Sequence, residues 1–400
     1  MLPKLSKKIA ACNESQTLAL TALAQKLQSE GHDVVSLTAG EPDFPTPTHI
    51  KFAAIDAINS NKTKYTLNSG IIPLRKAIAE KLKKDNGLDW SEKNILVSSG
   101  AKQSLFNVLQ AICNPKDEVI IPAPFWVSYP EMVKLVDAKP IILNTNQKND
   151  FAINPAELRK SITKKTKAII LCSPSNPTGV VYNKKVIEQI VKIIEKTNIF
   201  VISDEIYEKI IYDGAKHVSI GQYDSIRNRV ITINGVSKAF SMTGWRLGYA
   251  AGCLEVIKAA GTVQSQVTSN ASSISQYAAL EAISKESPDV EIMRKEFEKR
   301  RNYIFKQLTS IPNITSAKPQ GAFYLFPNVG KYLNKKYKGV TIKTVDNLVK
   351  YFIEEEKVVM VPGSAFGSPN HIRLSYACSM DNLEKACARL KRGFEKLSKG

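Results

Sequence analysis

The sequence lacks any apolar run long enough to cross a bilayer. Its longest runs, such as residues 167–172, have the length of a strand, whereas a membrane-spanning helix needs about 20 apolar residues. The basic start, Met1–Lys8, is not followed by the apolar stretch and cleavage site of a secretory signal. We therefore expect a cytoplasmic protein with no membrane contact.

Cysteine and histidine are scarce. The chain has only four histidines, and its six cysteines are scattered: Cys12, Cys113, Cys172, Cys253, Cys378 and Cys387. No C-x-x-C pair occurs, and a zinc site or a disulfide framework would need closer spacing. We expect no metal, and free, buried thiols in a reducing compartment.

Acidic residues are in the minority, with 37 Asp and Glu against 56 Lys and Arg, which gives a formal net charge of +19. The lysines are spread along the chain in pairs, such as Lys83-Lys84 and Lys164-Lys165. No basic block is interleaved with aromatic residues, and neither zinc-finger spacing nor an RNP-like motif occurs. We expect solvated surface charge and no nucleic-acid partner. An anionic cofactor and acidic substrates would suit this charge.

A length of 400 residues allows two domains. From about residue 90, short β-rich runs alternate with helical stretches, which predicts an α/β domain with a mostly parallel central sheet flanked by helices. Several runs lack polar alternation, as in strands covered on both faces. The expected strands are 94–98, 118–121, 140–143, 167–171, 198–203, 229–233 and 248–251, with helices at 104–112, 186–196 and 273–284.

The pattern changes after about residue 288 and predicts a smaller α+β domain. A long charged helix over 290–308 precedes strands at 321–326, 358–361 and 371–374, and a last helix begins at Asp381. A first helix over 16–30 stands apart from the repeating units and is expected to pack on this second domain. We thus predict a large domain at 46–289, and a small domain built from 1–45 and 290–400.

Residues with chemical potential follow the predicted strands, where open α/β sheets bind ligands. Strand 94–98 leads through Gly100, Ala101 and Lys102 into a helix. Small residues let backbone N–H groups approach an anion at a helix N-terminus, although a tight turn that needs glycine would read the same way.

Two further strand ends carry an acid and a lysine. Asp204 ends strand 198–203, with Tyr207 close behind, and could hold a pyridinium N–H; a helix-capping aspartate is the alternative. Lys238 follows strand 229–233 and could form a Schiff base through its neutral amine. Ser237 and Arg246 offer donors suited to phosphate oxygens.

Three more residues complete the set. Asn176 lies in the turn Pro174–Gly179 after strand 167–171 and could donate to a ring hydroxyl or a carboxylate. Arg373, on a strand of the small domain, has the planar fork that suits a carboxylate, although a surface arginine is the default. Trp126 could stack on a planar ring, or could simply pack in the core.

Together these residues resemble the fold-type I pyridoxal-phosphate (PLP) aminotransferases of class I, in particular the bacterial aspartate aminotransferase branch. The resemblance runs nearly end to end. It rests on the motifs Ala39–Phe44, Lys64–Tyr65, Ser99–Gln103, Pro124–Trp126, Ser173–Gly179, Asp204–Tyr207, Ser237–Phe240, Gly244–Gly248 and Gly363–Phe366.

The resemblance implies a role for each matching position. Lys238 would bind PLP covalently and shuttle the substrate's proton, Asp204 would pair with the pyridine nitrogen, and Tyr207 and Asn176 would hold the 3′-oxygen. The other implied cofactor contacts are phosphate binding by Gly100, Ala101, Ser237 and Arg246, joined by Tyr65 of a partner subunit, and stacking by Trp126. Arg373, with Asn176 and the backbone of Gly40, would bind the substrate's α-carboxylate.

The same resemblance implies a ping-pong transfer of an amino group from aspartate or glutamate to a 2-oxo acid. The animal-type branch uses an arginine for the distal carboxylate, but no arginine occurs between Arg246 and Arg294. Lys102 matches the lysine that the bacterial branch uses instead, with Ser15 and Thr17 as helper hydroxyls. Because Tyr65 would act across an interface, the resemblance implies a homodimer.

Other activities remain open on the same scaffold. They are aromatic or alanine transamination, a PLP-dependent β-lyase, and prephenate transamination, for which relatives carry a basic residue and proline where this chain has Asn13-Glu14. A PLP-fold DNA-binding regulator would need a helix-turn-helix module before Gly40, and the chain has no room for one there.

Overall fold

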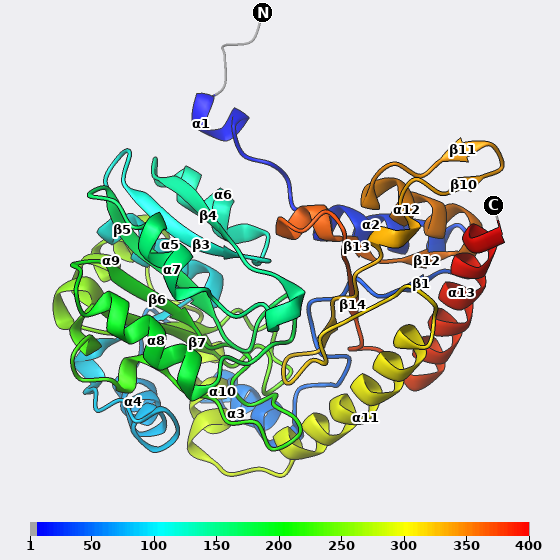
Figure 1. The fold of residues 1–400 in the computed structure, drawn as a ribbon. Helices are drawn as coiled ribbons and strands as arrows, with labels where there is room; N and C mark the ends of the chain where they lie inside the picture. Colours follow the sequence, from blue (N-terminus) through cyan, green and yellow to red (C-terminus); the bar gives the residue numbers. More distant parts are fainter. Residues whose placement is uncertain (1–5, 400) are drawn as a thin grey trace, which may run out of the picture.

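The computed structural model describes residues 6–399. A twisted central sheet with helices on both faces forms one side of the molecule, and a smaller group of short strands and long helices forms the other side (Figure 1). The division into domains at 46–289 and at 1–45 with 290–400 stays a prediction. The site described below lies between these two groups of elements.

The central sheet has seven strands in the order β2-β8-β7-β6-β5-β3-β4. Only β8 runs antiparallel to its neighbours β2 and β7, whereas the other pairs are parallel. The strands are β2 (Ile95–Ser98), β3 (Glu118–Ala123), β4 (Lys139–Asn144), β5 (Thr166–Cys172), β6 (Phe200–Asp204), β7 (Val230–Gly235) and β8 (Gly248–Ala251). This confirms the predicted α/β class and all seven expected strands.

Helices cover both faces of this sheet, because the apolar strands leave two faces to bury. They are α3 (Thr48–Asn59), α4 (Ile72–Asn86), α5 (Ala101–Ile112), α6 (Ser128–Leu135), α7 (Pro155–Ser161), α8 (Lys184–Ile194), α9 (Leu254–Val267) and α10 (Ser273–Ser284). Asn183 and Ser272 accept a backbone N–H of the first turn and so fix where α8 and α10 begin. The sequence analysis predicted α5, α8 and α10 but not the other five.

The second group of elements is built around α11 (Asp289–Thr309) and α13 (Met380–Lys399). A three-stranded antiparallel sheet, β13 (Val361–Pro362), β14 (Ile372–Ser375) and β9 (Tyr324–Leu325), lies beside them. The remaining elements are β1 (Val35–Ser36), β10 (Lys336–Tyr337), β11 (Val340–Thr341), α12 (Val345–Tyr351) and β12 (Val358–Val359). Their apolar side chains share one core, which includes Phe297, Phe323 and Leu374.

Two expected strands of this part are wrong in extent. The run 358–361 divides at Met360, since β12 pairs in parallel with β1 while β13 pairs with β14. Within 321–326 only Tyr324–Leu325 is a strand. Helix α2 (Gln16–Ser29) contacts β1, β12 and β13, as the sequence analysis expected of the first helix.

The N-terminal segment links the two groups. Short helix α1 (Lys7–Ala10) lies beside α6 at the central sheet, where Lys8 pairs with Asp137 at 2.6 Å. The chain then crosses to α2 on the other side (Figure 1). Residues 11–15 therefore connect the central sheet with the second group of elements.

The surface features agree only in part with expectation. The pairs Lys83-Lys84 and Lys164-Lys165 are exposed, as predicted for solvated charge. The six cysteines are free, but Cys387 alone is buried and the other five are partly exposed, so the prediction of buried thiols is wrong for those five. No helix within residues 6–399 combines the length and apolarity needed to span a membrane.

Candidate active site

A cavity of ≈ 420 Å³ lies at the carboxyl ends of the parallel strands, between the central sheet and the second group of elements. Ligands of open α/β sheets bind at this edge. Thirteen of the fifteen predicted site residues line it: Ser15, Thr17, Gly40, Ala101, Lys102, Trp126, Asn176, Asp204, Tyr207, Ser237, Lys238, Arg246 and Arg373. The fold therefore collects side chains that the sequence spreads over more than 350 positions.

Asp204 is the last residue of β6 and is buried. Tyr129 donates its phenol to Oδ2 at 2.7 Å, and the backbone N–H of Ile206 donates to Oδ1 at 3.3 Å. Burial raises the pKa of Asp204 to about 6, against these two hydrogen bonds, which lower it. The carboxylate is therefore oriented, and it can be ionised near neutral pH.

Lys238 lies three residues after β7 and reaches back into the cavity. Its ammonium donates to the carbonyl oxygen of Gly40 at 2.6 Å and lies 5.9 Å from the ring centre of Tyr207. Burial, opposed by Glu41, lowers the pKa of Lys238 to about 8. The neutral form of this amine, which a nucleophile or base requires, is therefore easier to reach near neutral pH than for an ordinary lysine.

The first turn of α5 forms an anion-binding corner of the cavity. Gly100 precedes the helix with φ = 92°, and a side chain there would collide with Arg246, while one at Gly248 would collide with the backbone of Ala101. Both glycines thus keep the helix N-terminus close to β8 and to the Arg246 guanidinium. Free N–H groups and a cation converge there, a combination that binds phosphate.

Arg373 brings a second, buried cation to the cavity. It projects from β14, donates to Asn176 Oδ1 at 3.1 Å and to the Thr38 carbonyl at 2.7 Å, and stacks 4.6 Å from the ring centre of Tyr324. Its Nε has no hydrogen-bond partner within residues 6–399. A buried guanidinium with an unused donor is suited to a carboxylate ligand.

Two hydroxyls lie at the same cavity. Tyr207 and Tyr324 share a hydrogen bond of 2.9 Å between their phenol oxygens, and both side chains are buried. The bond joins the segment after β6 to β9, so the two groups of elements are connected at the floor of the cavity.

Trp126 and Lys102 lie side by side at the cavity. The ammonium of Lys102 lies 4.9 Å from the centre of the Trp126 ring, within the range of a cation–π contact. Partial desolvation and the nearby Arg246 lower the pKa of Lys102. Lys102 is solvent-accessible, so its charge is free to meet an anion that enters the cavity.

Ser15 and Thr17 reach the cavity from the start of α2. The Ser15 hydroxyl caps this helix by accepting the N–H of Leu18 at 3.4 Å, so part of its role is structural. Thr17 Oγ1 is buried without a partner in the described part of the chain.

Two predicted residues do not line the cavity. Gly100 lies just behind its wall, as described above. Tyr65 is 92% exposed on the surface of the single chain. The predicted role of Tyr65 at the phosphate site of a partner subunit stays a prediction.

The sequence analysis missed Tyr129, Tyr324, Glu41 and Thr243, which also line the cavity. Tyr129 follows Trp126 by three residues, one turn along the chain, and this spacing was the available signal. Tyr324 lies in a predicted strand, but only tertiary structure brings it to Arg373.

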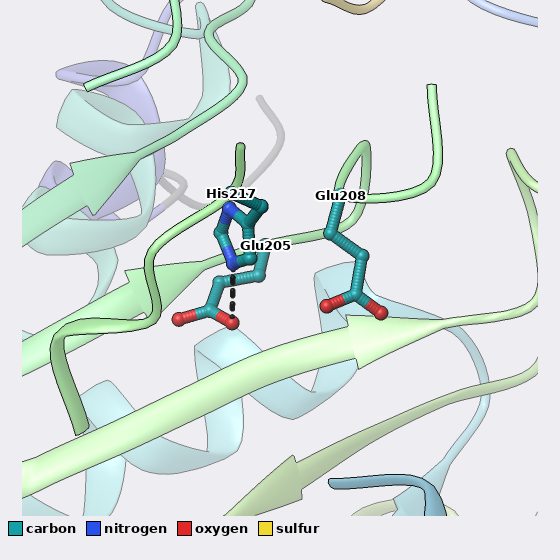
Figure 2. Close-up of side chains that lie close together, drawn as sticks. All are labelled: Glu205, Glu208 and His217. Carbon is teal, nitrogen blue, oxygen red and sulfur yellow. Dashed lines mark hydrogen bonds and ion pairs between the residues drawn. The ribbon is translucent and has the colours of Figure 1, made fainter. Parts of the chain in front are cut away.

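A separate polar cluster lies behind the segment that follows β6. Glu205, Glu208 and His217 bring their potential ligand atoms within 4.8 Å of one another (Figure 2). The sequence analysis considered metal sites only through cysteine and histidine spacing and did not identify this group. His217 Nε2 lies 2.9 Å from Glu205 Oε2, the contact drawn in the figure.

Protein groups already satisfy these carboxylates. Glu205 also accepts from Ser203, Ser219 and Asn86, and Glu208 accepts from Lys81 and Asn86. A cation would have to displace the Lys81 ammonium, so we interpret the cluster as a buried structural network.

Comparisons with known proteins agree with this geometry. The family model described as aminotransferase class I and II matches residues 32–390. The aspartate aminotransferase of Bacillus subtilis is 48% identical and covers 99% of this chain and 100% of its own length. A bifunctional aspartate aminotransferase and glutamate/aspartate-prephenate aminotransferase of Petunia hybrida is 46% identical, over 97% of this chain and 82% of its own.

Solved structures give the same result. The aspartate aminotransferase of Thermus thermophilus with maleate superposes with a TM-score of 0.93 at 40% identity, over 98% of this chain and 100% of the other. The family match, these identities and the shared fold converge on one assignment. This chain belongs to the class I and II aminotransferase family.

Proposed function

We propose that this protein is a PLP-dependent aminotransferase that moves the amino group of aspartate or glutamate to a 2-oxo acid by a ping-pong mechanism. The observation that carries the proposal is that the Lys238 amine and the Asp204 carboxylate line the same cavity. The pKa of Lys238 is lowered to about 8, which suits an amine that must act both as nucleophile and as base. We expect it to act in the cytoplasm.

The cavity fits PLP on grounds of its donor set. The α5 N-terminus, Ser237 and Arg246 would hold the phosphate, and the missing side chains at Gly100 and Gly248 leave the backbone free to approach it. Asp204 would face the pyridine nitrogen, with Tyr207 and Asn176 at the 3′-oxygen and Trp126 against the ring. When bound, PLP supplies an aldehyde and an electron-withdrawing ring that acidifies the α-hydrogen of an attached amino acid.

The side chains of this protein then have separate tasks. Lys238 Nζ would bind the cofactor at rest and later remove the α-proton, for which it must be neutral. Arg373, supported by Asn176 and the Gly40 backbone, would hold the α-carboxylate, since its Nε lacks a partner. This contact would fix the bond to the α-hydrogen as the one that faces the ring, and so favour removal of the α-proton over loss of the α-carboxylate.

The dicarboxylic preference rests on Lys102. Its charge is accessible in the cavity beside Trp126, and Arg373 lines the same cavity, so the two carboxylates of a dicarboxylic acid could each meet a cation. Ser15 and Thr17 would add hydroxyl donors. Relatives carry the name aspartate aminotransferase, and the Thermus structure contains maleate, itself a dicarboxylate.

The direct test is a half-reaction titration of the purified holoenzyme with one amino acid at a time. Aspartate and glutamate should bleach the bound cofactor and release one equivalent of oxo acid, whereas alanine and phenylalanine should react poorly. Borohydride reduction should fix PLP on wild-type protein, but not on Lys238→Ala, as read by mass spectrometry. Lys209→Ala, a lysine outside this cavity, is the matched control. PLP fixed on Lys238→Ala would refute the proposal.

Prephenate is the second candidate acceptor, because the Petunia relative is named for it. Here Asn13 is bound through its backbone N–H to Glu131 at 3.1 Å, and Glu14 follows, so the segment beside Ser15 is acidic. The segment therefore lacks the basic residue and proline that the sequence analysis expects there for prephenate transamination. Adding prephenate to the acceptor panel separates this activity from the dicarboxylic one.

A further inference from the structure

The sequence analysis assigned no role to the phenol of Tyr129. Tyr129 lies in the first turn of α6, three residues after Trp126, and is 2% exposed. Its hydroxyl donates to Asp204 Oδ2 at 2.7 Å, in the interior of the protein. A hydrogen bond to a buried carboxylate is stronger than one between neutral groups.

Packing fixes the direction of this donor. The Tyr129 ring meets Trp126 edge to face, with 5.3 Å between ring centres and 85° between planes. The ring also belongs to the apolar cluster between α5, α6 and the sheet, which includes Val133 and Ile121. The phenol therefore cannot turn away from Asp204 without disturbing the ring that would stack on the cofactor.

The second oxygen of the carboxylate is held as well. Asp204 Oδ1 accepts the N–H of Ile206, so both oxygens have a donor and the plane of the carboxylate is set. Burial of Tyr129, together with the Asp204 charge, raises the pKa of the phenol, which keeps it protonated as a donor.

The groups facing Asp204 do not favour its charge equally. Burial raises its pKa, Tyr129 lowers it, the neighbouring Glu205 raises it and Lys238 lowers it; the Cys172 thiol, on the adjacent strand, stays neutral because burial raises its own pKa to about 12. Without the phenol, little besides the Ile206 N–H and the lysine would oppose protonation. If Lys238 were bound covalently to a cofactor, its charge would oppose protonation of Asp204 less.

We propose that Tyr129 is a positioning residue that holds the Asp204 carboxylate ionised and oriented for the pyridine nitrogen of the cofactor. This inference rests on the proposed function. It adds a group that acts on the cofactor through Asp204 and touches neither the phosphate nor the substrate carboxylates. It also links the Trp126 ring and the Asp204 acid in one rigid unit.

The test compares wild type with Tyr129→Phe, which removes the hydroxyl and keeps the ring. In the apoenzyme, infrared titration of the Asp204 carboxyl, assigned with Asp204→Asn, should move to higher pH. The PLP dissociation constant should rise about 10- to 100-fold, the loss expected for a hydrogen bond to a charged group. In the holoenzyme kcat should fall while KM for aspartate stays within about threefold, since no substrate contact is lost.

The matched control is Tyr332→Phe. Tyr332 is equally buried and donates to the Pro312 carbonyl at 2.7 Å, far from the cavity, so this change should lower stability without altering PLP binding. The double variant Tyr129→Phe with Asp204→Asn closes a mutant cycle. In the Asp204→Asn background the second change should weaken PLP binding less than about twofold.

Two results would overturn the positioning role. One is an Asp204 titration that is the same in Tyr129→Phe and wild type; the other is an equal loss of PLP affinity with and without the Asp204 carboxylate, which would assign the effect to packing. Because the titration uses apoenzyme, these results are distinct from failure of the proposed function, for which wild type would bind no PLP at Lys238.

Discussion

At the scale of single residues, the site combines side chains whose charge is opposed by their surroundings. Burial pushes Asp204 toward its neutral form and also makes Lys238 easier to deprotonate. Neighbouring hydrogen bonds and charges offset only part of the free-energy cost of burying these two charges. Such perturbed pairs in a cavity are typical of catalytic sites, and most variants at these positions should change chemistry more than stability.

Lys102 gives the prediction that belongs to this scale. Lys102→Ala should raise KM for aspartate about 10- to 100-fold, because the distal carboxylate would lose its charged partner. KM for phenylalanine or an alkyl amino acid should change much less. Steady-state kinetics with each donor at saturating PLP measure the difference.

One control for Lys102 keeps the positive charge at this position, and the other removes a lysine elsewhere on the surface. Lys102→Arg should keep most of the aspartate preference, and Lys258→Ala, an exposed lysine on α9, should change nothing. An equal rise in KM for all donors would assign Lys102 to cofactor binding instead of substrate choice.

The sequence was sufficient for residues whose roles depend on strand ends. Asp204, Lys238 and Asn176 follow apolar strands directly, and parallel strands bring their carboxyl ends to one edge. Tyr324 was missed because one phenol in a short strand has no pattern of its own, and Tyr129 had only its spacing of three residues from Trp126 as a signal. Asp204, the partner of Tyr129, lies 75 positions along the chain. Arg373, the partner of Tyr324, lies on a different strand.

At the scale of secondary structure, buried strands were predictable and several helices were not. The seven sheet strands are short apolar runs between turns, which leave little ambiguity. Helices α3 and α9 present apolar residues such as Ile55 and Val267 to solvent in the single chain, and this blurs the pattern of one buried face. The run 358–361 reads as one strand, yet its halves pair with different partners.

The segment between β6 and β7 depends on the network of Glu205, Glu208 and His217. Burial opposes the charge on His217, but Glu205 and Glu208 outweigh it and raise its pKa above 6.5. Lys81 and His217 likewise lower the pKa of Glu208 to about 2 against the effect of burial. The imidazolium therefore contributes stability below its unfolded pKa, and this contribution is lost as pH rises through the folded pKa.

His217→Gln should remove the loss of stability that accompanies deprotonation of His217 as the pH rises. As the pH rises above about 6.5, the Tm of wild type should fall relative to the variant, because only wild type loses a proton held on His217. The carboxylate of Glu208 contributes above pH 4.5 and loses its contribution only toward pH 2, outside this window. Scanning calorimetry of both proteins across the range gives the difference.

His32→Gln is the matched control, since His32 is exposed. It should leave the profile parallel to wild type. Other groups titrate in the same range, Asp204 and Lys238 among them, but they are common to all three proteins and cancel in the difference. A His217→Gln profile parallel to wild type would show that folding does not raise the pKa of His217.

At the scale of the whole molecule, the single chain leaves an apolar surface uncovered. Exposed apolar side chains lie on α3, on the loop that leads to α4, at the start of α4 and at the end of α9: Phe52, Ile55, Ile58, Tyr65, Leu67, Ile72 and Val267. The loop is tied to α9 by the bond from Asn68 to the Gly261 carbonyl. Patches of this kind mark interfaces, and the predicted homodimer, with Tyr65 reaching the partner's phosphate site, would cover it.

Subunit complementation tests this arrangement. Tyr65→Ala should weaken PLP binding and Lys238→Ala should abolish activity, so each variant alone is inactive at limiting PLP. If Tyr65 serves the partner's site, a hybrid dimer contains one site with both native residues. When the two variants are mixed in equal amounts and their subunits exchange freely, half of the dimers are hybrids. Because one of the two sites in each hybrid is intact, the mixture should regain roughly a quarter of wild-type activity.

The alternative arrangement gives the opposite result. If Tyr65 served its own subunit, every site in the hybrid would lack either Tyr65 or Lys238, and mixing would restore nothing. The control replaces Tyr65→Ala by Arg373→Ala: Arg373 is buried beside Asn176 of the same chain, so both defects again lie in different subunits. In that hybrid the subunit with native Arg373 lacks Lys238, and activity should stay absent, because both residues must act in the cavity of one chain.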